Sequence, residues 1–234
     1  MKAMEDTGKP RSERETRTRC GRPPLERAGE VDARILNAAT RVFLDRGFEG
    51  ASIDLIAETA RSGKPTIYAR YPNKEALFAA ALADRIALKH ARVGDHKPAG
   101  DTLEARLAGI AVTLVNETLT EEFVGLYRLC LSESRRFPDL VRSLGRMARR
   151  RGGEIIGQLL AGASQCGQLD AALGDNEERQ ARAARYFIDL NLLPLLIRAL
   201  AGEPLEALRA EFVNEADRRV AFFLAACRNG GLAS

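Results

Sequence analysis

Two prolines and a glycine within ten residues constrain the fold of this chain more than any other feature of its sequence. Gly63 and Pro65 predict the start of a very short helix, because a missing backbone N–H costs little in the first helical turn. Pro72 ends that helix near Tyr71, since the residue before a proline disfavours helical dihedral angles. Asn73 then caps a further helix. The segment therefore predicts a short helix held between longer ones.

The short helix presents polar and basic side chains on its outer face. The helical spacing exposes Lys64, Thr66 and Tyr68, together with Arg70, whereas Ile67 faces inward and can anchor the helix to a small core. A short basic helix on a compact helical unit is how a helix-turn-helix protein presents itself to the major groove of DNA. For Tyr68, packing in the small core is the alternative.

Longer helices are predicted on both sides of this segment. In residues 30–46, apolar side chains recur at three- and four-residue spacing, and Gly47 is a suitable residue to end that helix in the left-handed conformation. Ser52 is a predicted N-cap for the next helix. The helix that begins at Asn73 is expected to continue to about residue 92.

The rest of the chain is also predicted to be helical. Ala, Leu, Arg and Glu dominate, and no segment shows a sustained alternation of β-branched residues. The sequence therefore predicts an all-α fold of about nine helices, with a three-helix helix-turn-helix domain followed by a helical domain. The helices predicted in that second domain are residues 101–118, 121–136, 138–163, 176–201 and 205–228.

Charge follows the same division. A basic flexible arm over residues 1–28 precedes a helix-turn-helix domain over 29–92, and a linker leads to a helical domain over 101–234. Residues 1–100 hold 19 Lys and Arg against 14 Asp and Glu, whereas residues 101–234 hold 17 against 18. This excess of positive charge fits a module that faces nucleic acid. A basic disordered tail on a neutral protein is the alternative.

Several other classes of protein do not fit the sequence. The four cysteines are far apart and only His90 and His96 are present, so we expect no metal site. We find no Ser/His/Asp or Cys/His set and no phosphate-binding loop, so we expect neither an enzyme nor a cofactor. The N-terminus lacks an apolar signal segment, and the longest apolar run is too short to span a bilayer. We therefore expect a cytoplasmic protein with no membrane partner.

The last two predicted helices are unusually apolar. Residues 187–197 are apolar almost all round, and the final helix carries a continuous apolar stripe. Two such helices predict a self-paired four-helix interface, and hence a homodimer. The alternative is that both helices complete the core of a single chain. The predicted interface residues are Leu192, Leu196, Phe212, Ala216, Val220 and Phe223.

Over residues 31–78 the chain resembles the DNA-binding domain of the TetR family of bacterial transcriptional regulators. The Gly21-Arg22-Pro23 arm is similar to a basic extension of many members, and residues 132–140 are similar to a segment of drug-responsive members of the TetR/AcrR group. The residues that carry the main resemblance, in a fixed order, are Ile35, Ala38-Ala39, Phe43, Gly47-Phe48, Ser52-Ile53, Ile56-Ala57 and Lys64 through Phe78.

The chain departs from the family pattern in the turn before the short helix. Arg61 stands where the family usually has Gly, Ser62 where it has an apolar residue, and Gly63 where it usually has Ser. We therefore expect a turn of different geometry and a short helix without a side-chain cap. Ala69 is smaller than the residue often found at its position, so one potential base contact is absent.

The resemblance implies DNA contacts on and around the short helix. Thr66 and Tyr68 resemble positions whose hydroxyls touch phosphates, and Lys74 could hold a phosphate with the amides of its helix N-terminus. Arg22 could lie in the minor groove, or act as part of a non-specific tail. Lys74 could instead be a solvated surface lysine. Candidates for base-edge contact are Lys64, Pro65 and Arg70. The full predicted DNA-binding set is Arg22, Ser52, Lys64, Pro65, Thr66, Tyr68, Arg70 and Lys74.

For the C-terminal domain the resemblance implies a small-molecule pocket, mostly apolar with a few polar groups. The implied function is a homodimeric, ligand-responsive repressor that binds a palindromic operator in double-stranded DNA and is released by a small, largely apolar effector. The alternative is a helical interaction module that uses its basic arm on an acidic partner or a membrane surface. The candidate pocket residues, each of which could instead be ordinary core, are Phe123, Tyr127, Leu131, Leu144, Met147, Leu159, Phe187 and Asn191.

Overall fold

A computed structural model describes residues 25–95, 100–169 and 176–229 of the chain. Within these residues the chain forms nine helices and no strand, which confirms the predicted all-α fold. None of the described helices is long and apolar enough to cross a membrane. The helices are α1 (Leu25–Gly50), α2 (Ile53–Thr59), α3 (Lys64–Tyr68), α4 (Lys74–Asp95), α5 (Leu103–Thr118), α6 (Glu121–Ser132), α7 (Pro138–Gln165), α9 (Glu177–Leu200) and α10 (Leu205–Arg228).

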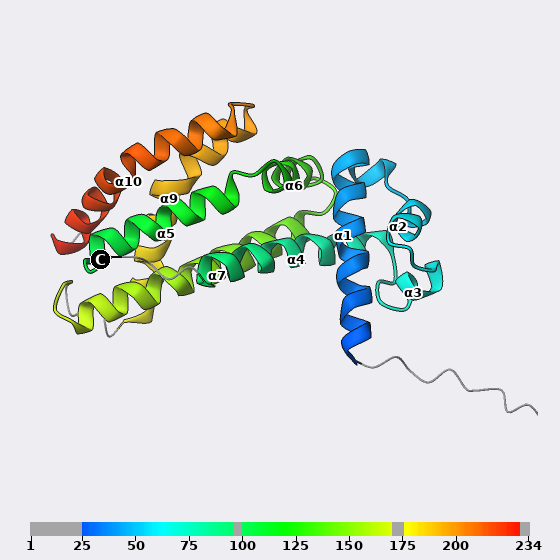
Figure 1. Cartoon of the computed structure of the whole chain (residues 1–234), viewed down its shortest axis with the longest axis horizontal. Coiled ribbons are helices and arrows are strands. Elements are labelled where there is room, and N and C mark those ends of the chain that lie inside the picture. The colour runs from blue at the N-terminus through cyan, green and yellow to red at the C-terminus, as the bar shows by residue number, and fades with distance from the viewer. Residues whose placement is uncertain (1–24, 96–99, 170–175, 230–234) are drawn as a thin grey trace, which may run out of the picture.

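The molecule is elongated, with α1, α2 and α3 at one end and α5, α9 and α10 at the other (Figure 1). The two ends are joined by α4 and α7, which run side by side and contact each other. Two buried apolar clusters correspond to the two ends. The helices at the α3 end are therefore held on a core of their own.

Short polar side chains begin several of these helices. Ser52 Oγ accepts a hydrogen bond from the N–H of Leu55 at 3.2 Å, and Asn73 Oδ1 accepts one from the N–H of Ala76 at 2.7 Å. Both predicted N-caps are therefore confirmed. The side chains that cap α5, α6 and α9 in the same way are Thr102, Thr120 and Asn176.

The first helix starts earlier than expected and is interrupted where expected. It begins at Leu25 rather than near Glu30, so the end of the predicted arm is helical. Gly47 interrupts it with φ of 69° and ψ of 176°, a conformation that is open to glycine and strained for other residues. The chain therefore turns here, and Phe48 packs back into the core with 1% exposure.

The turn between α2 and α3 closes by two backbone hydrogen bonds. The N–H of Ser62 donates to the carbonyl of Ala57 at 2.9 Å, and the N–H of Arg61 donates to that of Glu58 at 3.0 Å. These are the two bonds of a Schellman motif, which places its C′ residue in the left-handed region. Arg61 itself occupies that position, with φ of 48°. The expectation of a different turn geometry is therefore wrong, because the arginine adopts the conformation that a glycine would adopt.

An aromatic cluster forms the centre of the N-terminal core. The rings of Phe43, Phe48 and Phe78 have centroid separations of 5.0, 5.1 and 5.9 Å. Ile67, which is fully buried, joins α3 to this core as predicted. Burial of a side chain of this size contributes roughly 1.5–3 kcal/mol. Because Ile67 must face the core, its burial sets the orientation of α3, which has only five residues.

The two ends of the molecule are not separated by the predicted linker. α4 continues to Asp95, so Val93 belongs to the C-terminal core. In the opposite sense, Leu126 of α6 and Leu144 of α7 pack into the N-terminal core. The two parts therefore share buried surface through α4, α6 and α7. Residues 96–99 of the predicted linker lie outside the described residues.

The C-terminal core is formed by α5, α7, α9 and α10. Phe187 of α9 and Phe223 of α10 meet edge to face with centroids 5.1 Å apart. The apolar stripe of α10 faces α5 and forms part of the core of one chain. The residues predicted for the dimer interface are between 0% and 7% exposed in one chain and offer little surface to a second copy: Leu192, Leu196, Phe212, Ala216, Val220 and Phe223.

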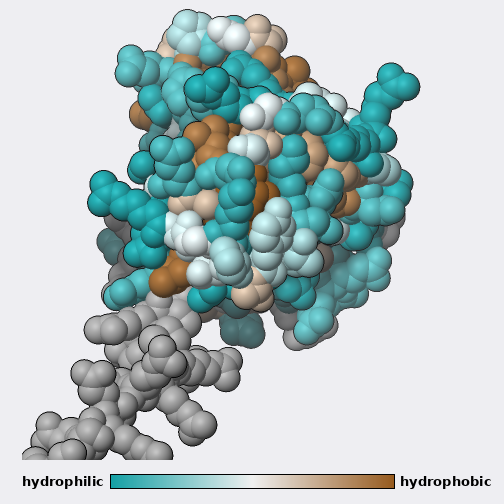
Figure 2. Space-filling model, turned by 90° about the vertical axis from the view of Figure 1, so that its right-hand side faces the viewer, coloured by the Kyte–Doolittle hydropathy of each residue, from teal (hydrophilic) through white to brown (hydrophobic). Residues whose placement is uncertain are grey.

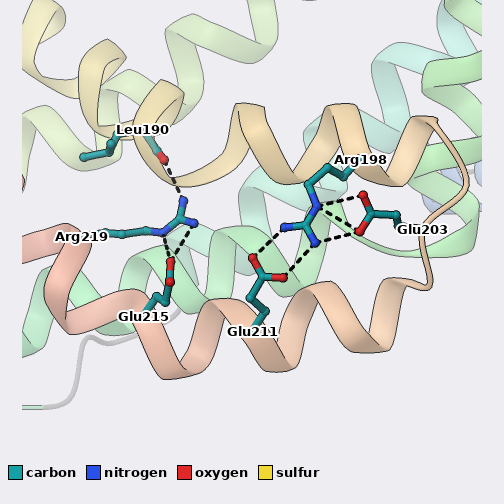
Figure 3. A network of polar contacts seen from close by, with 6 residues as sticks. All are labelled: Leu190, Arg198, Glu203, Glu211, Glu215 and Arg219. Carbon is teal, nitrogen blue, oxygen red and sulfur yellow. Dashed lines mark hydrogen bonds and ion pairs between the residues drawn. The ribbon is translucent and has the colours of Figure 1, made fainter.

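Arginine side chains hold α9 and α10 in register (Figure 3). The Arg198 guanidinium donates to the carboxylates of Glu203 and Glu211 at 2.6–3.0 Å, and these bonds lower the pKa of both carboxyls. Arg219 Nη1 donates to the carbonyl of Leu190 at 3.1 Å. Both arginines link the two helices, so they fix which residues of α9 lie opposite which residues of α10.

Candidate functional site

The polar side chains on the outer face of α3 are exposed to solvent. Tyr68 is 50% exposed, and the side chain of Lys64 is 53% exposed. Pro65 is exposed and Thr66 is partly exposed on the same short helix. Figure 2 looks at this end of the molecule, where hydrophilic surface predominates. The exposure of Tyr68 is inconsistent with a packing role in the small core.

Lys64 on this face and Ser52, the N-cap of α2, each keep a group that can bind a ligand. Lys64 Nζ lies 2.6 Å from Asp54 Oδ1, but both side chains are more than half exposed. Such a pair is worth only about 0–1 kcal/mol, so a phosphate can compete with the aspartate. Ser52 uses its oxygen as an acceptor for the N–H of Leu55, which leaves its hydroxyl hydrogen to donate to an oxygen of a ligand.

Arg70 is not placed as predicted. Its Nη1 donates to the carbonyl of Thr66 at 3.2 Å, and its Nε lies 3.3 Å from Asp32 Oδ1 on α1. The same carboxylate oxygen accepts a hydrogen bond from the Tyr71 hydroxyl at 2.8 Å. Burial and this bond raise the pKa of Tyr71. Because Asp32 holds both side chains, Arg70 secures α3 to α1 and does not extend toward a base edge.

Lys74 is also occupied within the fold. Its ammonium donates to the carbonyls of Phe48 at 2.9 Å, Ala51 at 3.0 Å and Glu49 at 3.4 Å. It also lies 4.6 Å from the centroid of the Phe48 ring. In this structure the Lys74 ammonium is engaged by backbone carbonyls, and its contact with a phosphate stays a prediction. The lysine closes the chain between α1 and α2, where backbone carbonyls end without helical partners.

The structure adds one residue to this face and leaves one predicted residue untested. Arg61 is exposed at the turn that leads into α3, and its left-handed conformation was not expected for an arginine. The sequence signal for this residue was that arginine stands at position 61, where the family usually has glycine. Arg22 lies outside the described residues.

A cavity of about 130 Å³ lies between α4, α6 and α7. Of the eight predicted pocket residues, Phe123, Tyr127, Leu131 and Leu144 line it. Arg85, which was not among the predicted pocket residues, also lines it. The remaining lining residues are Leu82, Ile86, Leu126, Cys130, Val141, Gly145 and Ala148.

The other four predicted pocket residues are elsewhere. Met147 packs against the N-terminal core, and Leu159 and Phe187 belong to the C-terminal core. Asn191 is fully buried, and its Nδ2 donates to the carbonyl of Phe187 at 2.8 Å. Helical periodicity identified these residues as inward-facing. It did not show that the chain has two cores, of which the N-terminal one contributes Leu82, Leu126 and Leu144 to the cavity lining.

A buried lysine lies beside the cavity wall. Lys89 is 6% exposed, and its Nζ lies 4.3 Å from the centroid of the Phe123 ring and 3.4 Å from Thr118 Oγ1. Burial lowers its pKa to about 8. Its position three residues after Ile86 on the inner face of α4 was the available sequence signal.

A set of contacts links the cavity to the α3 end of the molecule. Phe137, in the loop between α6 and α7, meets the Phe48 ring edge to face at 4.9 Å. The Arg136 guanidinium lies 5.0 Å from the centroid of the Phe48 ring and pairs with Glu49. Both helices joined by this loop line the cavity. A change in the cavity can therefore reach Phe48, whose carbonyl is held by Lys74.

An exposed apolar surface lies on α9 and α10. Tyr186, Leu193 and Ile197 are 51%, 47% and 57% exposed and share one face of α9 by their spacing. Phe222 of α10 is 69% exposed and lines a surface hollow together with Tyr186. Exposed apolar residues gathered in this way mark contact surfaces more often than scattered ones do.

Sequence profiles of known families match both ends of the chain. A profile described as bacterial regulatory proteins of the TetR family matches residues 35–81. A profile described as the C-terminal domain of AefR-like transcriptional repressors matches residues 105–229, which is more than half of the chain.

Individual proteins give the same pattern. Over 54 residues the chain is 48% identical to the HTH-type transcriptional repressor SCO4008 of Streptomyces coelicolor. This match covers 23% of this chain and 28% of that protein. The match thus spans little more than a quarter of that relative's length.

Two solved structures resemble the whole fold. A TetR-family transcriptional regulator from Mesorhizobium loti superposes with a TM-score of 0.69 at 25% identity, over 86% of this chain and 98% of that chain. The regulator FadR of Bacillus subtilis, solved with stearoyl-CoA, superposes with a TM-score of 0.57 at 14% identity, over 82% and 97%. At that identity the second likeness concerns the fold alone.

Proposed function

Because the chain belongs to the TetR family of bacterial transcriptional regulators, we propose that it is a repressor that binds a palindromic operator as a homodimer and is released by a small effector. It acts in the cytoplasm, on double-stranded DNA. The observation that supports this proposal most is the solvent-exposed outer face of α3. Lys64, Thr66 and Tyr68 lie on this helix, and the buried Ile67 anchors it.

DNA recognition rests on the chemistry of that face. The hydroxyls of Thr66 and Tyr68, with that of Ser52, donate to phosphate oxygens and set the register of the helix. Lys64 and Pro65 lie at the start of α3, where a recognition helix meets base edges in the major groove. Of the residues predicted for base contact, these two remain in the proposal.

Dimerisation rests on the exposed apolar surface of α9 and α10. Tyr186, Leu193, Ile197 and Phe222 would be covered by the same residues of a second copy about a two-fold axis. Two α3 helices held in this way would read half-sites about 34–36 Å apart.

Release rests on the path from the cavity to α3. An effector bound between α4, α6 and α7 would favour a position of the α6–α7 loop that changes the contact of Phe137 and Arg136 with Phe48. The shift in DNA affinity can be no larger than the effector's preference for that state.

Selection from a random duplex library at about 0.15 M salt tests the proposal. The full-length protein should enrich one palindrome, and sequencing should show half-sites one helical turn apart. Thr66→Val and Tyr68→Phe should each weaken binding about fivefold on every duplex, because each removes one phosphate bond. Thr113→Val is the matched control, since its hydroxyl bonds to Gly109 within α5, far from α3.

Absence of any enriched palindrome would contradict the proposal. Binding that vanishes uniformly as salt is raised, without sequence preference, would instead favour a purely electrostatic surface binder.

A further inference from the structure

The size of the cavity between α4, α6 and α7 limits what can occupy it. Its volume is about 130 Å³. An apolar protein cavity of roughly 150 Å³ holds one benzene ring. The walls contributed by Leu82, Phe123 and Leu144 are apolar, so an apolar ring would be favoured over water in this space.

Arg85 lines the cavity, and one of its nitrogens lacks a hydrogen-bond partner among the described residues. Among the described lining residues, Arg85 is the one with a charged side chain, and that side chain is 13% exposed. Its Nη2 donates to Asn37 and Asp84, both at 2.7 Å. Its Nε is buried and has no hydrogen-bond partner within the part of the chain that the structure describes. An acceptor atom on a bound molecule would satisfy this donor.

The charge around Arg85 argues against an anionic ligand. Asp84 lies 2.7 Å from the guanidinium and Glu122 lies 3.5 Å from it. The positive charge is therefore already compensated. A carboxylate brought into the cavity would lose its water and face two existing carboxylates, whereas a neutral oxygen would bear neither cost.

Covalent capture is also disfavoured. Cys130 lines the cavity, but burial raises the pKa of its thiol to about 11. The thiol therefore remains protonated at neutral pH, and the thiolate is the reactive form. The ligand that fits this wall binds reversibly.

We propose that the effector is a small neutral molecule with a single aromatic ring and one oxygen acceptor, such as an aromatic ketone. This inference rests on the proposed function, of which it specifies the effector. The ring lies against Phe123 and Leu144, and the oxygen accepts a hydrogen bond from Arg85 Nε. Long-chain acyl-CoA esters, which are large and anionic, match neither the volume nor the charge of this cavity.

Matched ligands test the proposal on the full-length protein by titration calorimetry without DNA. Acetophenone and ethylbenzene share a benzene ring with a two-carbon side chain, and only the first carries an oxygen. Acetophenone should bind about tenfold more tightly than ethylbenzene, because only the ketone satisfies the Nε donor. Benzoate, an anion of similar size, and stearoyl-CoA should bind at least about tenfold more weakly than acetophenone.

Two substitutions assign the binding to this wall. Arg85→Lys keeps the positive charge near Asp84 and lacks the Nε donor, so acetophenone should lose its advantage over ethylbenzene. Leu144→Trp fills the cavity and should abolish binding of both ligands, while circular dichroism verifies that each variant is folded.

Each result bears on one proposal or the other. Tighter binding of benzoate or stearoyl-CoA, or an unchanged preference in Arg85→Lys, would overturn the ligand class. Failure of all four ligands to bind would overturn it too, even if a palindrome is enriched in the duplex selection. Acetophenone binding without a palindrome would support the ligand class and contradict the operator-binding function.

Discussion

At the scale of single residues, Arg61 occupies a conformation that usually belongs to glycine. A non-glycine residue in the left-handed region costs roughly 1–2 kcal/mol, and here the Schellman bonds at the end of α2 impose that cost. Backbone strain of this kind is often kept where a side chain has a use. Arg61 is exposed beside α3, where its charge suits a phosphate.

We therefore expect Arg61→Gly to separate stability from DNA affinity. The variant should gain about 1 kcal/mol in free energy of unfolding, because the strain is relieved. Its operator affinity should fall, and the salt dependence of binding should become shallower by about one phosphate contact. Urea denaturation and operator titration at several salt concentrations measure the two effects. Arg61→Asn, which tolerates the conformation and lacks the charge, should lose affinity similarly. Unchanged affinity in both variants would argue against a phosphate contact.

A second prediction at the scale of single residues concerns Lys89, whose contribution to stability should depend on pH. Below about pH 8 its ammonium is charged in both folded and unfolded chains, so the fold bears the full cost of burying the charge. Between about pH 8 and the ordinary lysine pKa of 10.5, the folded chain is neutral while the unfolded chain still binds the proton. The contribution of Lys89 to stability therefore rises with pH in this window.

Lys89→Met should be more stable than the parent protein at pH 7, by about 1–3 kcal/mol. The attraction between Lys89 and the Phe123 ring offsets part of the gain. The difference in free energy of unfolding should narrow between pH 8 and 10.5, as measured by urea denaturation. Lys64→Met, at an exposed pair, should differ from the parent by only a few tenths of a kcal/mol at any pH. A constant difference for Lys89→Met across the window would contradict the buried-charge interpretation.

At the scale of elements, the loop between α6 and α7 joins two helices that line the cavity, and it packs against Phe48 in the core that holds α3. Phe137 and Arg136 both lie against Phe48, and Arg136 also pairs with Glu49. An aromatic pair of this geometry is worth about 0.5–1.5 kcal/mol beyond its buried area. In the proposed mechanism, these contacts transmit a displacement of either helix to Phe48.

Phe137→Leu should weaken the effector response more than DNA binding itself. Without effector, operator affinity should stay within about twofold of the parent, because α3 is anchored separately by Ile67. With effector, the loss of operator affinity should be several-fold smaller, since the contact to Phe48 is reduced. Operator titrations with and without acetophenone measure both quantities. Arg142→Gln is the control, since it pairs with Asp139 on α7 rather than with the Phe48 region. An intact response in Phe137→Leu would place the coupling elsewhere.

At the scale of the whole molecule, the proposed dimer rests on the exposed apolar face of α9 and α10. Ile197 and Phe222 are more than half exposed although both are apolar. Ile197→Glu should therefore convert the dimer to a monomer in size-exclusion chromatography with light scattering. Operator binding should fall at least about a hundredfold, because one half-site alone is contacted.

Val213→Glu provides the matched control for that experiment. Val213 is 55% exposed on α10, but nine residues of helix separate it from Phe222, so it lies on roughly the opposite side. This variant should remain a dimer. A dimeric Ile197→Glu protein, or a monomeric Val213→Glu protein, would move the interface to a different face.

The sequence by itself determined most of the helix ends, the start of α1 and the end of α4 excepted. The caps at Ser52 and Asn73, the glycine break at Gly47 and the proline-delimited helix around Lys64 were all predicted, and the C-terminal helices lie within a few residues of their predicted bounds. These features depend on bonds between residues at most about five positions apart, so the local sequence contains the information.

Only the tertiary structure decided which face of each helix is buried and which partners the long side chains contact. Leu192 and Phe212 became core while Ile197 became surface, because α5 and α7 cover one side of α9 and α10 and leave another open. Arg70 and Lys74 found partners on α1 and at its end, rather than on the outer face. Such outcomes depend on contacts between segments far apart in the chain, which helical periodicity does not specify.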